Sequence, residues 1–327
     1  MSLRIVKPGV LDTIQDGGRW GYQHLGININ GPMDRFSAQL GNALLGKDLR
    51  SPVIEMHFPA AQVEFTSPTI ICLTGADFAP TIDGVEIPMH HPIMVGPNAF
   101  LKCNRMVTGA RCYLSVWHDL ELKQWLNSYS TNLRASVGGI EGRNLAKDDI
   151  IPLIKREESL AALLQAKDCI VMPWKSQEIV SNRNNIQFII GSEWQWMSSE
   201  ARETFLTSWF QVTIDADRVG YKLAGPRLES CNHTELISAP VSFGTVQWLP
   251  DGQLIILMAD HQTTGGYPRV AQVISAHLPI LAQKKANDVI QFELTDLAIA
   301  ETKKIKQQKY LQQLQLASKL RIEEYLS

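Results

Sequence analysis

Hydrophobic positions along most of the chain follow the two patterns that are typical of β-strands. In VIEMHF (53–58), Ile54, Met56 and Phe58 share one face, which predicts a half-buried strand. TIICLT (69–74) is continuously apolar, as in a strand that is covered on both faces. Gly, Pro or Asn turn residues bound most of the further candidates. These candidates are 85–87, 93–95, 99–103, 111–116, 186–190, 209–214, 241–247, 254–258, 270–275 and 289–294.

Helical spacing of apolar residues is confined to a few segments. Residues 33–44 carry apolar side chains at helical spacing, Asp34 suits the first turn, and Gly46 suits the C-terminal cap. The segment 155–168 predicts a short helix. Residues 295–327 contain no Gly or Pro and are rich in helix formers, which predicts a long helix packed on the body or on a partner. The alternative for this last segment is a solvated, frayed tail.

Close spacing of short strands with isolated helices favours a mainly β (α+β) protein over a doubly wound parallel sheet. A length of 327 residues is too great for one small core, so we expect two domains. The expected division is a β-rich N-terminal domain over 1–155, a connecting segment over 156–185, a β-rich C-terminal domain over 186–294 and the C-terminal helix over 295–327.

Composition narrows the class of protein. The chain is 45% hydrophobic and 20% charged with a net charge of −2, so it has no general attraction to nucleic acid or acidic membranes. It shows neither an apolar run of membrane-spanning length nor an apolar leader at its start, and we expect a cytoplasmic protein. The 5 cysteines are scattered and form no C-x-x-C pair, which argues against a disulfide framework and a structural zinc site.

The most site-like segment is the polar loop ADHQTTGGYP, which lies between the apolar runs 254–258 and 270–274. Two adjacent glycines permit positive φ and close approach of a ligand to backbone N–H groups. Asp260 is expected to orient a water molecule or an amide, and Pro268 stiffens the turn. Such a loop suits binding of a carbonyl or phosphoryl group. Its expected ligand-binding residues are Gln262, Thr263, Thr264, Gly265, Gly266 and Tyr267.

Three other loops carry candidate residues. In 11–36, Arg19 has a planar fork of donors for a carboxylate or phosphate, and His24 is a candidate acid or base. The alternative is a turn-rich hairpin with solvated charges. Asp77 follows shortly after the buried strand 69–74. A carboxylate at a strand end is found both in catalytic sites and in turns.

The third loop, DADRVGYKLAGP (215–226), follows a predicted strand. Asp217, Arg218 and Tyr221 flank Gly220 in this segment. An Arg–carboxylate pair here either fixes the loop or clamps a substrate, and the residues alone leave both open.

Two apparent motifs predict no chemistry. Residues 41–47 fit G-x-x-x-x-G-K, but Asp48 stands where a phosphate loop needs a Ser or Thr hydroxyl, and the glycines close a predicted helix instead of opening one. His90 and His91 with His57 lack an acidic ligand at suitable spacing, so surface histidines are the expected interpretation and no metal site is predicted.

Together these stretches resemble a known family, the C component of bacterial 5-oxoprolinase, also called KipA or allophanate hydrolase subunit 2. This family is related to the biotin-dependent carboxyltransferase region of urea carboxylases. The resemblance runs in order from about residue 3 to 294. The motifs that carry it are PGVLDTIQDGGRWGYQHLGI (8–27), GPMDRFSAQLGNALLG (31–46), LTGAD (73–77), GGIEGR (138–143), DADRVGYKLAGP (215–226) and ADHQTTGGYPRVAQVISAHLP (259–279).

The resemblance implies two cyclophilin-like β-barrel domains that form a cleft. It also implies a role in ATP-dependent hydrolysis of 5-oxo-L-proline to L-glutamate, with a KipI-like B component for lactam activation and an A component. The implied cofactor is ATP with Mg, at a location that the sequence does not show. We expect catalytic roles for Arg19, Asp34, Asp77 and Asp260. Expected substrate-binding residues are His24, Asp217, Arg218, Tyr221 and the loop residues Gln262, Thr263, Thr264, Gly265, Gly266 and Tyr267.

Two alternative functions stay open. One is a carboxyltransferase component that acts on urea-like amides with carboxybiotin; because the chain has no biotin-accepting E-A-M-K-M motif, a separate carrier would be needed and no biotin is attached here. The other is a non-catalytic regulator that binds a KipI-like kinase inhibitor. The chain also departs from the resembled family, since Trp117 to Glu121 replace a Gly-Gly turn and Asn127 replaces another glycine.

Overall fold

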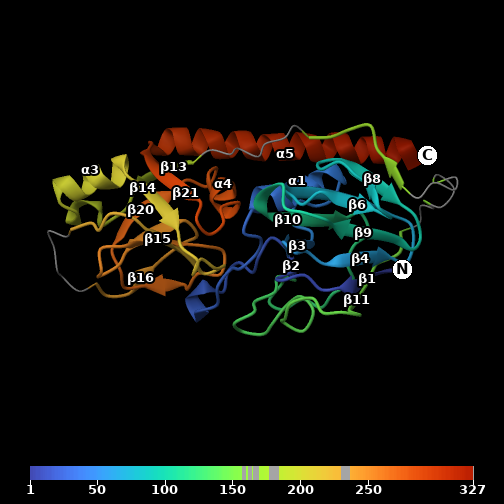
Figure 1. Ribbon diagram of the computed structural model, residues 1–327, viewed down its shortest axis with the longest axis horizontal. Coiled ribbons are helices and arrows are strands. Elements are labelled where there is room, and N and C mark those ends of the chain that lie inside the picture. The colour runs from blue at the N-terminus through green and yellow to red at the C-terminus, as the bar shows by residue number, and fades with distance from the viewer. Residues whose placement is uncertain (157–159, 161–163, 165–168, 177–183, 230–235, 327) are drawn as a thin grey trace. The chain divides into compact units, whose positions relative to one another are not determined.

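The computed structural model divides into two compact units, each of which is described by itself (Figure 1). The first unit comprises 1–19, 34–180 and 308–327, and the second comprises 20–33 and 181–307. The sequence-based division differs from this in placing 20–33 in the N-terminal domain. The described residues are 1–156, 160, 164, 169–176, 184–229 and 236–326. The predicted helix at 155–168 lies largely outside them, as does much of the predicted connecting segment 156–185.

The first unit is built from two six-stranded, antiparallel sheets within its described residues. Apolar side chains from both sheets, such as Leu3, Ile54 and Leu114, meet in one core. One sheet contains, in order, β11 (Ile150–Pro152), β1 (Ser2–Lys7), β4 (Gln62–Phe65), β9 (Ala99–Cys103), β6 (Pro80–Ile82) and β7 (Val85–Glu86). The other contains β12 (Cys169–Val171), β8 (Pro92–Val95), β5 (Thr69–Asp77), β10 (Thr108–Val116), β3 (Val53–His57) and β2 (Thr13–Gln15).

Helix α1 (Arg35–Leu44) begins and ends as its sequence predicts. Asp34 is the N-cap, and its carboxylate accepts hydrogen bonds from Ser37 N at 2.8 Å and Ser37 Oγ at 2.6 Å. Gly46 follows the helix with a φ of 62°, the left-handed conformation that favours glycine. The predicted stop at Gly46 is therefore confirmed, whereas Asp34 caps the first turn from outside it.

Lys47 turns inward directly after this stop. Its Nζ donates to Val116 O at 2.7 Å and His118 O at 3.1 Å, and it pairs with Asp119 Oδ1 at 3.1 Å. Burial lowers the pKa of the Lys47 amine to about 8, against an opposing effect of Asp119. Lys47, the lysine of the phosphate-loop-like segment, thus fastens the end of α1 to residues 116–119 of the first unit.

The second unit is a closed β-barrel with a core rich in phenylalanine. The rings of Phe205 and Phe292 stack with centroids 4.4 Å apart, and Phe188 meets both edge-on. Its seven described strands are, in order, β13 (Asn185–Ile190), β20 (Arg269–Val273), β17 (Thr245–Trp248), β18 (Leu254–Leu257), β15 (Gly220–Ala224), β14 (Trp209–Val212) and β21 (Val289–Leu294). The predicted mainly β architecture is confirmed, with the barrel in this unit.

Short elements surround the barrel. A small sheet joins β16 (Ala239–Pro240) to β19 (Thr264–Gly265). The helical elements of the unit are η1 (Gln23–Leu25), η2 (Trp194–Trp196), α3 (Ser199–Thr207) and α4 (Leu278–Ala282). Met33 lies in the barrel core, which explains why the segment 20–33 belongs to this unit.

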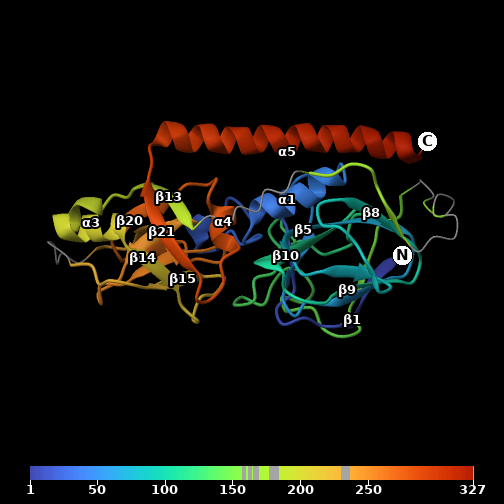
Figure 2. The ribbon, with the colours of Figure 1, turned by 45° about the horizontal axis from the view of Figure 1, so that its top comes forward.

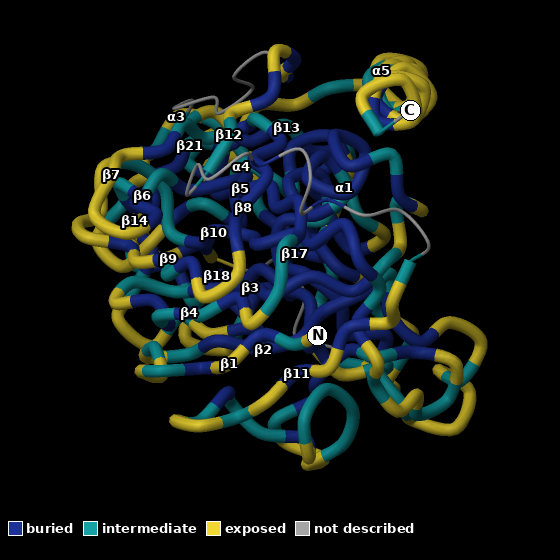
Figure 3. Tube along the Cα trace, turned by 90° about the vertical axis from the view of Figure 1, so that its right-hand side faces the viewer, coloured by how far each residue is buried: buried dark blue, intermediate teal, exposed yellow. Residues whose placement is uncertain are grey.

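The predicted C-terminal helix is confirmed as α5 (Leu297–Leu326). Its C-terminal part lies beside α1 in the first unit, where Leu311 and Ile322 join the core cluster that contains Leu40 (Figure 2). Much of its surface is nevertheless exposed (Figure 3). Within the described residues, no helix has the length and apolar character needed to cross a membrane.

The residues that depart from the resembled family fit the backbone found here. Trp117 packs into the same core cluster as α1, and residues 117–121 have no positive φ. Asn127 has a φ of 57°, and Asn is among the non-glycine residues that tolerate this conformation best. The departures therefore preserve the fold.

Lys47→Met is expected to change how stability depends on pH. Between a folded-state pKa of about 8 and the ordinary value of 10.5, unfolded Lys47 holds a proton that folded Lys47 lacks. The free energy of unfolding of the wild type should therefore rise with pH across this window, relative to the variant, by up to about 3 kcal/mol. Urea unfolding at both ends of the window measures the difference. Equal pH slopes in wild type and Lys47→Met would contradict burial of the charged amine, and Lys102→Met at an exposed site is the control.

Candidate functional site

A buried ion pair lies where strand β15 begins and the neighbouring strand β18 ends. Arg218 immediately precedes the turn into β15, and Asp260 follows β18, which pairs with β15. Arg218 Nε lies 2.8 Å from Asp260 Oδ2, and Arg218 Nη2 lies 3.1 Å from Asp260 Oδ1. The two side chains are only 6% and 9% exposed. Their backbones also meet, because Asp260 N donates to Arg218 O at 2.8 Å.

The segment 20–33 completes this arrangement. Asn30 Nδ2 donates to Asp260 Oδ1 at 2.6 Å, and Asn28 Nδ2 donates to the carbonyl of Asp260 at 3.0 Å. Arg218 Nη2 also donates to Gly31 O at 2.7 Å. We call these five residues, Asn28, Asn30, Gly31, Arg218 and Asp260, the Asp260 cluster.

The Asp260 cluster is a neutral, preorganised polar group. Asp260 Oδ1 accepts hydrogen bonds from both Asn30 and Arg218. Among the described residues, Oδ2 accepts from Arg218 alone. A carboxylate oxygen has two lone-pair directions, so Oδ2 keeps acceptor capacity for one more donor. The cluster therefore holds the Asp260 carboxylate in one orientation, and Oδ2 has acceptor capacity for an N–H donor.

The polar loop that follows Asp260 is anchored along one side and open on the other. Val241 N donates to Thr263 O at 3.1 Å, and Pro240 is the register partner of Thr264. Thr263 and Gly265 are half-buried. The exposed residues are Gln262, Thr264, Gly266 and Tyr267.

The predicted use of the two glycines in this loop is wrong in one respect. Neither Gly265 nor Gly266 has a positive φ. A Cβ at Gly265 would lie 2.4 Å from Gln247 Nε2, so a larger residue there would displace the end of the Gln247 side chain. Gly266 would meet its neighbours at ordinary contact distances.

Arg19 lies in the first unit, where its side chain is enclosed. The residue is 0% exposed, Nη2 donates to Ser130 O, and the guanidinium lies 4.9 Å from the ring centroid of Trp125. Protein groups therefore enclose Arg19, and its predicted catalytic role stays a prediction. Asp16 organises the same region, accepting from the hydroxyls of Ser128 and Ser130 at 2.6 Å each.

The other predicted acidic residues make local contacts. Asp34 caps α1, and Asp77 at the end of β5 accepts from Ala79 N at 2.7 Å. Asp217 accepts from Val219 N at 2.7 Å and Gly220 N at 3.0 Å. In these contacts Asp77 and Asp217 act as turn formers.

Tyr221 and His24 occupy opposite environments. Tyr221 is 1% exposed within the barrel core, and its hydroxyl donates to Lys284 O at 3.3 Å. Its predicted role in substrate binding stays a prediction. His24 is exposed in η1. Of the predicted set, the structure brings Arg218 and Asp260 into direct contact, and Gln262 to Tyr267 continue from Asp260 along the chain.

Residues 25–294 match the family model described as carboxyltransferase domain, subdomain A and B. The chain belongs to this carboxyltransferase domain family. It is 35% identical to the C component of 5-oxoprolinase from Haemophilus influenzae over 302 residues, which is 92% of this chain and 94% of that protein. It is 32% identical to the C component of 5-oxoprolinase from Escherichia coli over 314 residues, which is 95% of this chain and 97% of that protein.

A solved structure shows the same fold. The urea carboxylase of Kluyveromyces lactis superimposes with a TM-score of 0.87 at 25% sequence identity. The superposition covers 96% of this chain and 29% of the urea carboxylase chain. This carboxyltransferase domain therefore corresponds to under a third of that larger protein.

Sequence reasoning missed several polar residues of this carboxyltransferase domain. Asn28 and Asn30 escaped notice, although an Asn-Gly pair at 30–31 is a turn signal and Asn30 has a φ of 59°. Glu193 and Arg269 form a second ion pair at 2.8 Å. Glu193 lies just after the end of β13, and Arg269 begins the neighbouring strand β20. No local pattern links any of these residues to its partner.

The described histidines and the phosphate-loop-like segment make other contacts than those of a metal or phosphate site. Among the described residues, no group of three or more His, Cys, Asp or Glu side chains is placed to hold a metal ion. The segment 41–47 does not fit a phosphate, because Lys47 Nζ faces backbone carbonyls and α1 ends at this point.

The Arg218–Asp260 pair is expected to act as a unit. Asp260→Ala leaves a buried guanidinium without its carboxylate and should lower the free energy of unfolding by about 3–5 kcal/mol. Arg218→Met leaves the buried carboxylate without its guanidinium and should lower it by a similar amount. The double variant should lose at least about 1.5 kcal/mol less than the sum of the two. Denaturant unfolding of the four proteins measures this coupling, with Asp215→Ala at an exposed site as the control. Strict additivity would show that the two charges do not depend on each other.

Proposed function

We propose that this protein is the C component of an ATP-dependent 5-oxoprolinase, which converts 5-oxo-L-proline to L-glutamate together with a KipI-like B component and an A component. The observation that carries the proposal is similarity over nearly the full length of both chains. This chain matches 94% and 97% of the lengths of two proteins that bear the name of the 5-oxoprolinase C component.

The chemistry of the proposed reaction explains its need for ATP. A lactam carbonyl is a poor electrophile, and transfer of the γ-phosphoryl group of ATP to its oxygen yields ADP and a lactam with a good leaving group. Attack of one water molecule at the activated carbon opens the C–N bond and leaves an acyl phosphate on the freed chain. A second water molecule hydrolyses this acyl phosphate to inorganic phosphate and L-glutamate. The residues of this chain are proposed to bind and orient the lactam for these steps.

The Asp260 cluster suits that task. Asp260 Oδ2 keeps an acceptor lone pair for the lactam N–H. Arg218 and Asn30 hold the carboxylate in place, and Asn28 holds the backbone carbonyl of the same residue. The hydroxyls of Thr263 and Thr264, in the loop that continues from Asp260, supply donors for substrate oxygens.

Nucleotide binding is proposed to lie with the assembled enzyme. The segment of this chain that most resembles a phosphate loop does not fit a phosphate, since its lysine is buried against carbonyls. No step of the mechanism is therefore assigned to ATP or Mg bound at these residues.

A carboxyltransferase reaction is the second candidate. The family description and the close fold similarity to urea carboxylase favour it. In this case the same cluster would hold a urea-like amide, and carboxybiotin would arrive on a separate carrier because the chain has no E-A-M-K-M motif.

Reconstitution separates these functions. Combining the protein with its A and B components should release L-glutamate and ADP from 5-oxo-L-proline and ATP, and no component should do so on its own. Absence of glutamate from the complete trio would contradict the proposal. Carboxylation of an amide by carboxybiotin would instead establish the second candidate. Stable capture of the B component with neither activity would favour a regulatory role.

Thr263→Val and Thr264→Val are expected to slow turnover in the reconstituted enzyme. Each change removes a hydroxyl donor while keeping side-chain shape, and each should lower kcat/KM by about tenfold. Binding to the B component, measured by co-elution, should stay intact. Thr302→Val on the exposed surface of α5 is the matched control. Unchanged kcat/KM in both loop variants would remove the loop from the substrate site.

A further inference from the structure

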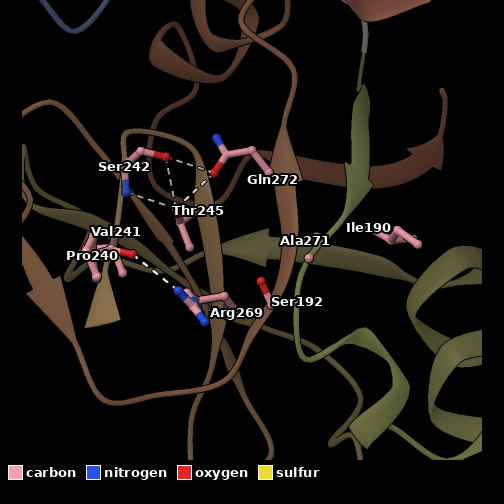
Figure 4. A pocket seen from close by; sticks show the side chains of 10 residues that line it. Ile190, Ser192, Pro240, Val241, Ser242, Thr245, Arg269, Ala271 and Gln272 are labelled. Carbon is pink, nitrogen blue, oxygen red and sulfur yellow. Dashed lines mark hydrogen bonds between the residues drawn. The ribbon is translucent and has the colours of Figure 1, made fainter. Parts of the chain in front are cut away.

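A polar pocket lies on the barrel of the second unit. It has a volume of about 340 Å³, and its walls come from the turn after β13, the segment that leads into β17, and β20 (Figure 4). It shares no residue with the Asp260 cluster. Its lining includes Gly191, Ser192, Pro240, Ser242, Arg269 and Gln272.

Arg269 presents a partly neutralised guanidinium to this pocket. Its Nε and Nη2 lie 3.0 Å and 2.8 Å from the two carboxylate oxygens of Glu193, and its Nη1 donates to Pro240 O at 3.4 Å. Burial would raise the pKa of the Glu193 carboxyl, but the hydrogen bonds from Arg269 outweigh it and lower the pKa. These contacts use three of the five guanidinium N–H donors. The other two have no acceptor among the described residues. The pocket therefore offers charged donors that are held rigidly by Glu193.

The opposite wall offers an acceptor. Gln272 Oε1 accepts from the hydroxyls of Ser242 at 3.1 Å and Thr245 at 2.9 Å, while Gln272 Nε2 donates to Phe243 O at 2.9 Å. Ser242 Oγ also lies 3.3 Å from Thr245 Oγ1, and whichever of these hydroxyls donates to the other, the Ser242 oxygen keeps a lone pair for an N–H donor. A ligand that fits therefore has an acidic oxygen group at one end and an N–H at the other.

The pocket is coupled to the polar loop through a shared wall. Pro240 lines the pocket and is the register partner of Thr264, and Val241 N donates to Thr263 O at 3.1 Å. A ligand that contacts Pro240 and Ser242 would reduce the motion of this wall. The loop on its other side would be held with it.

We propose that this pocket binds a small organic carboxylate that also carries an N–H group, and that the bound ligand rigidifies the segment Thr263 to Gly266. The carboxylate accepts from the two remaining N–H groups of Arg269 and from the Ser192 hydroxyl, and the ligand N–H donates to Ser242 Oγ. The choice of 5-oxo-L-proline and L-glutamate as probes rests on the proposed function, and both belong to this chemical class.

Glycine-selective ¹⁵N labelling of the full chain tests the proposal without any turnover. Titration with 5-oxo-L-proline and, separately, L-glutamate should shift the amide signals of Gly191 and Gly265, with a dissociation constant of about 1 mM or tighter for at least one probe. Binding of only one probe identifies which N–H carboxylate the pocket accepts. Inorganic phosphate should leave both signals unchanged. No shift with either carboxylate, or the same shifts with phosphate alone, would overturn the proposal.

Variants locate the binding. Ser192→Phe fills the pocket from an exposed position, and Arg269→Lys keeps the charge but removes the fork; each should weaken carboxylate binding at least about tenfold. Ser275→Phe, exposed just beyond β20, is the matched control and should bind as wild type does. Asp260→Asn should also retain the shifts at Gly191, which separates this pocket from the Asp260 cluster. Shifts confined to Gly31, or unchanged affinity in both pocket variants, would assign the ligand elsewhere. If Arg269→Lys fails to fold, Ser192→Phe decides alone.

Discussion

The buried ion pair between Arg218 and Asp260 is the contact on which the candidate site depends. Two charges in a barrel with little solvent are stable only if each satisfies the other and their remaining donors and acceptors are used. Here the backbone carbonyl of Gly31 and the amides of Asn28 and Asn30 supply what the pair leaves open. The pair thereby draws a segment from early in the chain onto a barrel built from its second half.

The polar loop takes its position from this arrangement. At its start, Asp260 is fixed by the ion pair, and further along Thr263 to Gly265 pair with the segment from Ala239 to Val241. A second carboxylate–guanidinium pair, Glu193 with Arg269, holds the strand to which the loop returns. The loop therefore presents exposed side chains from a backbone that is tied at both ends, which is the arrangement that binding sites require.

The sequence predicted the elements whose signals are local. The apolar runs of β5 and β10, the capped helix α1 with its stop at Gly46, and the long helix α5 were all found where expected. Each depends on residues within a few positions of one another. The identification of the family rested on long motifs, which are also local.

Properties that depend on distant contacts were beyond local patterns. Asn30 meets Asp260 across 230 positions of sequence, and no spacing rule connects them. Arg19 and Tyr221 looked available because they flank glycines, but Arg19 is enclosed by Ser130 and Trp125, and Tyr221 points into the barrel. Gly265 looked like a turn glycine, whereas it has no positive φ and lies against the side chain of Gln247.

Hydrogen exchange of the backbone amides in wild type and Asp260→Asn tests most directly whether the ion pair fixes the early segment to the barrel. If it does, the amides of residues 28–31 should exchange at least about tenfold faster in Asp260→Asn, because the variant weakens the charged hydrogen bonds that hold them. The amides of β5 (Thr69–Asp77), in the other unit, should exchange as in wild type. Equal protection of residues 28–31 in both proteins would show that the segment is held by other contacts, and that the ion pair does not organise the site.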